Sequence, residues 1–125
     1  MTSAKEGFMD AVSEELPAEM LSFVHDKLNS FVKWDILRFL KQNPHAADTQ
    51  AGLALYVGRR PEVVAPQLQE MADDGLLQVG SVGDMPVYTL TEDPATRDLV
   101  TRFLESCEDR RFRLRVVYHV ARCMR

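Results

Sequence analysis

The stretch LQEMADDGLLQVGSVGDMPVYTLT, residues 68–91, decides how this chain folds. Its first part carries apolar residues at helical spacing and ends at Gly75, a residue type that commonly follows the last turn of a helix. Residues 76–79 then predict a strand, residues 80–84 a turn, and residues 87–90 a returning strand. The sequence therefore predicts a helix that is followed directly by a β-hairpin.

Two helices are predicted upstream of this stretch. The segment FVKWDILRFLKQ repeats apolar residues every four positions, follows Ser30 as a candidate N-cap, and ends before Asn43-Pro44. The next segment, TQAGLALYV, predicts a short helix that Asp48 or Thr49 caps and that Gly58 ends.

The helix before the hairpin has one unusual residue. Pro61 suits the first helical position and Asp74 marks the predicted end of the helix. Pro66 lies too deep for a helix that starts at Pro61, because proline lacks the N–H that the helix interior requires. The sequence thus predicts that the helix either starts nearer Ala65 or is distorted at Pro66.

Helical patterns also flank this central region on both sides. Residues 5–29 carry apolar residues at helical spacing, and Pro17 either breaks this stretch or opens a second helix. Residues 94–124 predict a final helix with a kink near residues 110–113; if continuous, it would be about 46 Å long at 1.5 Å per residue. Because a domain of this size has a radius of gyration of about 14 Å, such a helix must bend back or pack against a second copy.

The composition is that of an ordinary globular protein. The chain has 125 residues, of which 46% are hydrophobic and 27% charged, so disordered and fibrous classes are excluded. No window approaches the ~18 consecutive apolar residues of a membrane helix, so no membrane partner is expected. The N-terminus has no apolar segment typical of a secretory signal. Two cysteines without CxxC spacing suit a reducing compartment, so we expect the protein to be cytoplasmic.

Charge is distributed unevenly along the chain. Residues 1–93 hold 7 basic against 15 acidic side chains, whereas residues 94–125 hold 8 arginines against 4 acids. Such asymmetry can mark a nucleic-acid surface or an acidic partner. It can equally mark a helix whose arginines pair with acids of the same domain or of a second subunit, which is the interpretation we prefer.

The order of these elements resembles the winged helix-turn-helix fold of bacterial transcription regulators. The resemblance covers residues 31–91 and rests on two local patterns. LQEMADDGLLQV is similar to the pattern L-x-x-L-x-x-x-G-L-I at the end of a recognition helix, and VYTLT is similar to the strand that leaves the wing in MarR-like and ArsR-like families. The helices on either side are similar to the dimerisation helices of those families.

The resemblance implies duplex DNA as a partner and a homodimer as the binding form. The helix after Arg60 would enter the major groove, where Arg59 and Arg60 could reach phosphates or guanines, and Gln67 could pair with adenine. Val63 could touch thymine methyl groups. Thr49 and Gln50, at the start of the preceding helix, could hold phosphates through free backbone N–H groups.

Two sequence features depart from that pattern. MarR-like proteins tend to show T-V-S-R where this chain has the apolar run Val63-Val64-Ala65-Pro66, and the predicted wing tip offers Asp84 but no Lys or Arg. Arg59 and Arg60 could also lie in a solvated turn or pair with Glu62. A winged-helix module that binds a protein partner instead of DNA is therefore the alternative, with the apolar run as a partner surface.

No catalytic or metal-binding pattern stands out in the chain. There is no nucleophile elbow, phosphate loop or HExxH sequence, so we expect no enzymatic activity and no cofactor. His119 and Cys123 share a helix face and have the only metal-like spacing, but two ligands make half a site, and packed helix residues are the preferred interpretation.

Taken together, the sequence predicts a mainly α fold with a small β-hairpin wing. Its winged helix-turn-helix core, residues 30–92, would be flanked on both sides. N-terminal helices in residues 1–29 would serve dimerisation or cover the core, and a C-terminal helix in residues 93–125 would serve dimerisation.

Overall fold

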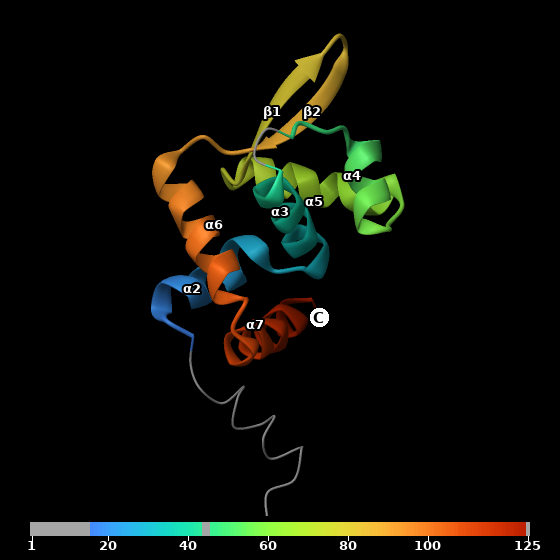
Figure 1. The fold of residues 1–125 in the computed structure, drawn as a ribbon. Coiled ribbons are helices and arrows are strands. Elements are labelled where there is room, and N and C mark those ends of the chain that lie inside the picture. The colour runs from blue at the N-terminus through green and yellow to red at the C-terminus, as the bar shows by residue number, and fades with distance from the viewer. Residues whose placement is uncertain (1–15, 44–45, 125) are drawn as a thin grey trace, which may run out of the picture. The chain divides into compact units, whose positions relative to one another are not determined.

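The structure is a computed structural model that describes residues 16–43 and 46–124 (Figure 1). The chain divides into two units, residues 32–101 and residues 1–31 with 102–125, and each is described by itself below. The helix predicted from Lys5 onward lies outside the described residues. The described elements are α2 (Ala18–Phe23), η1 (Val24–Leu28), α3 (Phe31–Gln42), α4 (Gln50–Val57), α5 (Pro61–Asp73), β1 (Leu77–Val82), β2 (Met85–Leu90), α6 (Pro94–Ser106) and α7 (Arg110–Cys123).

The unit of residues 32–101 is built from three short helices, the β1–β2 hairpin and the first part of α6. Helices α3, α4 and α5 pack together, and the hairpin projects away from them (Figure 1). Most of the buried side chains in these three helices, the hairpin and the turn before it are apolar, among them Ile36, Leu37, Leu40, Leu53, Val64, Leu68, Met71, Leu76, Leu77 and Leu90. The order helix, helix, helix, hairpin is that of a winged helix-turn-helix, so we call residues 32–101 the winged-helix unit. The predicted fold class is confirmed.

Two glycines with left-handed backbone conformations mark the ends of α4 and α5. Gly58 has φ +70°, and the N–H of Arg59 donates to the carbonyl of Ala54 at 3.0 Å, which ends α4. Gly75 has φ +79°, and the N–H of Leu76 donates to the carbonyl of Met71 at 2.9 Å, which ends α5. Both helix ends predicted from these glycines are therefore confirmed.

The hairpin is longer and its turn tighter than predicted from the sequence. β1 and β2 pair antiparallel from Leu77↔Leu90 to Val82↔Met85, which leaves a loop of Gly83 and Asp84 alone. Gly83 has φ +62°, the backbone conformation that a two-residue hairpin loop requires of its first residue. The expected turn over residues 80–84 was therefore wrong, because Gly80, Ser81 and Val82 continue the ladder.

The outer edge of β2 differs from that of β1. Tyr88 exchanges two backbone hydrogen bonds with Asp48, at 2.7 and 3.2 Å, on the side away from β1. Pro86, two residues earlier, points to the same side, so its missing N–H costs the β1–β2 ladder nothing. β1, by contrast, turns the backbone groups of Val79 and Ser81 outward.

The second unit contains α2, η1, the last turn of α6 and α7; we call its described residues, 16–31 and 102–124, the helical unit. Its core is aromatic: the ring of Phe103 lies 5.0 Å from that of Phe23 and 6.1 Å from that of Phe112, measured between centroids. Phe103 is completely buried. Aromatic pairs at such distances pack in tilted or edge-to-face arrangements, which stabilise beyond the area they bury.

Pro17 and Asp109 set helix boundaries, whereas Pro66 does not. Pro17 directly precedes α2, so it opens a second helix, one of the two predicted roles. α5 runs through Pro66 from Pro61 to Asp73, so the proline does not delay its start. The C-terminal segment breaks after Ser106, earlier than the predicted kink. The carboxylate of Asp109 accepts a hydrogen bond from the N–H of Arg111 at 2.9 Å and starts α7.

Candidate nucleic-acid interface

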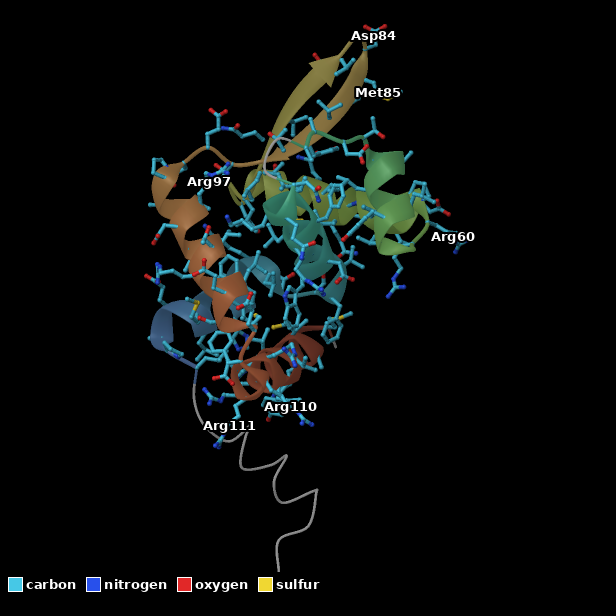
Figure 2. All side chains as sticks on the ribbon, in the orientation of Figure 1. Arg60, Asp84, Met85, Arg97, Arg110 and Arg111 are labelled. Carbon is cyan, nitrogen blue, oxygen red and sulfur yellow. The ribbon has the colours of Figure 1, made fainter. Side chains whose placement is uncertain are left out.

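The turn between α4 and α5 carries the two arginines that the sequence singled out. Arg59 follows the left-handed Gly58, and Arg60 is the extended N-cap residue of α5. Both side chains are exposed, and that of Arg60 points away from the helices (Figure 2). The fold therefore places two cations at the N-terminal end of α5, where the helix dipole adds positive potential.

Arg60 forms the ion pair with Glu62 that was weighed as its alternative role. Its Nε lies 3.4 Å from the carboxylate of Glu62, and 80% of the arginine side chain is exposed. Exposed pairs of this kind contribute about 0–1 kcal/mol. An incoming phosphate can therefore replace Glu62 as the partner of Arg60 at little energetic cost.

Thr49 and Gln50 use their side chains to hold the backbone in place. The hydroxyl of Thr49 accepts a hydrogen bond from the N–H of Gly52 at 3.1 Å, so Thr49, and not Asp48, caps α4. The side-chain amide of Gln50 donates to the carbonyl of Pro61 at 3.2 Å. Thr49 thus fixes the start of α4, and Gln50 ties it to the start of α5.

The apolar run Val63-Val64-Ala65-Pro66 does not form one exposed strip. Val64 is completely buried, whereas Val63 and Pro66 are exposed on the other side of α5. Helical periodicity explains the split, because adjacent residues point about 100° apart. The expectation of a continuous apolar partner surface at this run was wrong.

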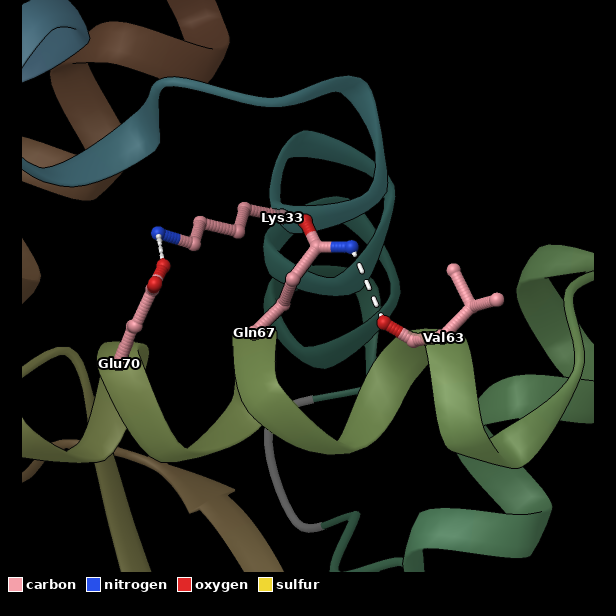
Figure 3. A network of polar contacts seen from close by, with 4 residues as sticks. All are labelled: Lys33, Val63, Gln67 and Glu70. Atoms are coloured by element: carbon pink, nitrogen blue, oxygen red, sulfur yellow. Dashed lines mark hydrogen bonds and ion pairs between the residues drawn. The ribbon is translucent and has the colours of Figure 1, made fainter. Parts of the chain in front are cut away.

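Gln67 lies on the exposed side of α5 with its amide folded back along the helix. Its Nε2 donates to the carbonyl of Val63 at 3.3 Å (Figure 3). The bond is long for a hydrogen bond and lies at the surface of the helix. α5 thus presents Val63 and Gln67 one helical turn apart.

A buried lysine behind α5 was not predicted from the sequence. Lys33 extends from α3 to α5, where its Nζ lies 2.6 Å from the carboxylate of Glu70 (Figure 3). The lysine side chain is 1% exposed and that of Glu70 60%. The two residues are 37 positions apart, and the apolar pattern of α3 gave no signal that one buried position would be charged. The pair also neutralises one of the acids on the exposed side of α5.

The hairpin offers apolar side chains where a cation would contact a phosphate. Val82 is 70% exposed and Met85 56%; they face each other across the two strands, and Asp84 lies at the tip (Figure 2). Residues 77–90 contain no Lys or Arg. The apolar character of this hairpin, rather than that of the run in α5, is the main departure from a DNA-binding surface.

Two further properties of the described residues bear on other functions. No three His, Cys, Asp or Glu side chains within residues 16–43 and 46–124 are placed to hold a metal ion. Over the same ranges, no helix combines the length and the apolar character needed to cross a membrane.

The winged helix-turn-helix architecture is shared with a known regulator. No protein-family model and no curated protein sequence matches the chain. Among solved structures, the chain is similar to the AntR antimony-specific transcriptional repressor, with a TM-score of 0.57 and 23% sequence identity. The match covers 86% of this chain and 96% of that one. The fold therefore extends over most of both chains.

Proposed function

We propose that this protein is a transcription regulator that binds duplex DNA through its winged helix-turn-helix. The observation that carries the proposal is the position of Arg59 and Arg60, exposed beside the N-terminal end of α5. In a helix-turn-helix, the N-terminal end of the second of the two helices, here α5, enters the major groove. The likeness to a transcriptional repressor supports the same function.

Some of the proposed contacts would position the protein on the DNA, and others would recognise the base sequence. Arg59 and Arg60 would bind phosphates or the O6 and N7 atoms of guanine. Val63 would touch a thymine methyl group, and Gln67 would bind adenine after releasing the carbonyl of Val63. Thr49 and Gln50 would hold the start of α4 against the DNA backbone. There, free N–H groups in the first turn of α4 can meet a phosphate.

The first prediction concerns binding to arbitrary duplex DNA, followed by fluorescence anisotropy from about 50 to 200 mM salt. We expect measurable affinity at low salt, because the phosphate contribution is independent of sequence. In the double variant Arg59→Ala/Arg60→Ala, the slope of log K against log salt should become shallower by about 2, one unit for each lost phosphate contact.

The matched control is Arg110→Ala/Arg111→Ala, which removes the same two charges from the start of α7 (Figure 2). We expect this control to keep the wild-type slope. Equal losses in the two double variants would show that only net charge matters and would contradict a DNA-binding α5.

We propose further that the regulator acts as a dimer formed through the helical unit. Two large apolar side chains are exposed here, Val117 in α7 and Met124 at its C-cap; they are seven positions apart and therefore on one side of the helix. A second copy would cover this side, and a twofold axis would place two α5 helices on half-sites about 34 Å apart.

The second prediction tests the dimer by sedimentation equilibrium at micromolar concentration. Val117→Asp should convert the dimer to a monomer, because a charge buried in an apolar interface is strongly unfavourable. The control is Leu55→Asp, at a side chain of the winged-helix unit that is 84% exposed. A wild-type monomer, or a Val117→Asp variant that stays dimeric, would contradict this interface.

A protein-binding winged-helix module is the second candidate function. It is favoured by the exposed apolar side chains of the hairpin, Val79, Val82 and Met85, in a segment without a single cation. Absence of DNA binding even at about 50 mM salt would favour this function, since phosphate attraction is strongest there.

A further inference from the structure

Three side chains with reactive or titratable groups meet within the helical unit. The Sγ of Cys123 lies 3.3 Å from the Nδ1 of His25. The ring of His25 in turn meets the ring of His119 at 5.3 Å between centroids, edge to face. His119 and Cys123 were paired by their spacing in the sequence, but His25, 98 positions before Cys123, could not be.

Local structure explains why these residues come together. His119 and Cys123 are four positions apart in α7 and therefore lie on one side of that helix. His25 belongs to η1, a π-helical segment closed by the N–H of Asn29 donating to the carbonyl of Val24 at 2.8 Å. Such wide turns are uncommon and are often found at functional sites. η1 packs against α7 and brings the imidazole to the sulfur.

The contact between the two atoms has a specific chemical meaning. In the tautomer that carries its proton on Nε2, the imidazole of His25 accepts the thiol hydrogen of Cys123 at Nδ1. A base in this position can take up the proton and leave a thiolate, which is the nucleophilic form of cysteine. Cys123 is also partly exposed, whereas Cys107 is buried. Cys123 therefore combines access with a base.

We infer that Cys123 and His25 form a reactive thiol site that is modified by small hydroperoxides. The thiolate of Cys123 attacks one peroxide oxygen, so a sulfur–oxygen bond forms as the oxygen–oxygen bond breaks. The leaving hydroxide takes the proton held by His25, which gives sulfenic acid and one molecule of water from thiol and hydrogen peroxide. The sulfur is oxidised by two electrons and the peroxide is reduced by two.

Oxidation would act on the packing of η1 against α7. Sulfenic acid adds an oxygen atom where Sγ now contacts Nδ1 at 3.3 Å, so that contact must open or rearrange. Both partners belong to the helical unit. The inference is independent of the proposed DNA binding.

The test follows the reaction of the full chain with hydrogen peroxide. Sulfenic acid is trapped by dimedone and located by peptide mass spectrometry, and the rate is compared with that of glutathione under the same conditions. We expect Cys123 to react at least about ten times faster than glutathione, and Cys107 to stay largely unmodified because it is buried.

Two substitutions separate the role of the imidazole from general effects on the helical unit. His25→Gln should slow modification of Cys123 by about tenfold, because the amide cannot take up the thiol proton. Lys27→Gln removes a positive charge from the same segment, η1, and should leave the rate within about twofold. Circular dichroism verifies that each variant is folded.

Either of two results would overturn the inference. One is a wild-type Cys123 that reacts no faster than glutathione, a comparison that needs no variant. The other is a folded His25→Gln variant that reacts at the wild-type rate. If His25→Gln does not fold, His25→Asn provides the same comparison.

Discussion

Replacing Phe103 by alanine should lower the free energy of unfolding by about 3–5 kcal/mol, the usual range for an aromatic residue removed from a core. Phe103 is completely buried and its ring contacts those of Phe23 and Phe112. The substitution removes both aromatic contacts and leaves a cavity that the surrounding helices cannot fully close. Urea unfolding followed by circular dichroism measures the loss as a lower midpoint at constant slope.

The control for this substitution is Leu55→Ala, at one of the most exposed apolar side chains of the described residues. It should change stability by no more than about 0.5 kcal/mol, since little apolar surface is lost from a buried environment. A loss below about 1 kcal/mol for Phe103→Ala would mean that the aromatic cluster is not the core of the helical unit.

Glu70→Ala should destabilise the protein by about 1–3 kcal/mol, whereas Lys33→Met should stay within about 1 kcal/mol of wild type. The reason is the unequal burial of the pair: the lysine side chain is 1% exposed and that of Glu70 60%. Removing Glu70 takes an acceptor from a buried ammonium group. Replacing the lysine removes the buried charge and fills the same space with apolar atoms.

Thermal and urea unfolding of both single variants and of the double variant give the coupling between the two residues. The double variant should recover most of the loss caused by Glu70→Ala, because no buried charge remains. Glu62→Ala, which breaks the exposed pair with Arg60, serves as the control and should change stability by less than about 0.5 kcal/mol. A greater loss for Lys33→Met than for Glu70→Ala would show that the buried charge itself holds α3 to α5.

Most of the fold could be predicted because local signals in the sequence agree with it. Gly58 and Gly75 have the left-handed backbone that ends a helix, and both helix ends lie where these residues predicted them. The boundaries that failed depended on information from elsewhere in the chain. The strands extend to Val82 and Met85. Pairing between the two strands determines where they end, whereas the prediction relied on the glycines at positions 80 and 83.

The parts of the site that were missed come from contacts between distant residues. The pair of Lys33 and Glu70 bridges two helices, and the contact of His25 with Cys123 joins the two ends of the chain. Periodicity identifies which side of a helix is buried but not which partner meets it. It also could not predict η1, because a π-helical turn has no distinct apolar spacing.

The unequal edges of the hairpin determine how it could aggregate. The β2 edge is obstructed at Tyr88, which already pairs with Asp48, and at Pro86, which has no N–H to donate. Only β1 can accept an additional strand. If β1 of a second copy added there, the resulting four-stranded sheet would have a β2 strand at each outer edge. Growth would stop at two copies, so this exposed, uncharged strand is self-limiting and does not template a fibril.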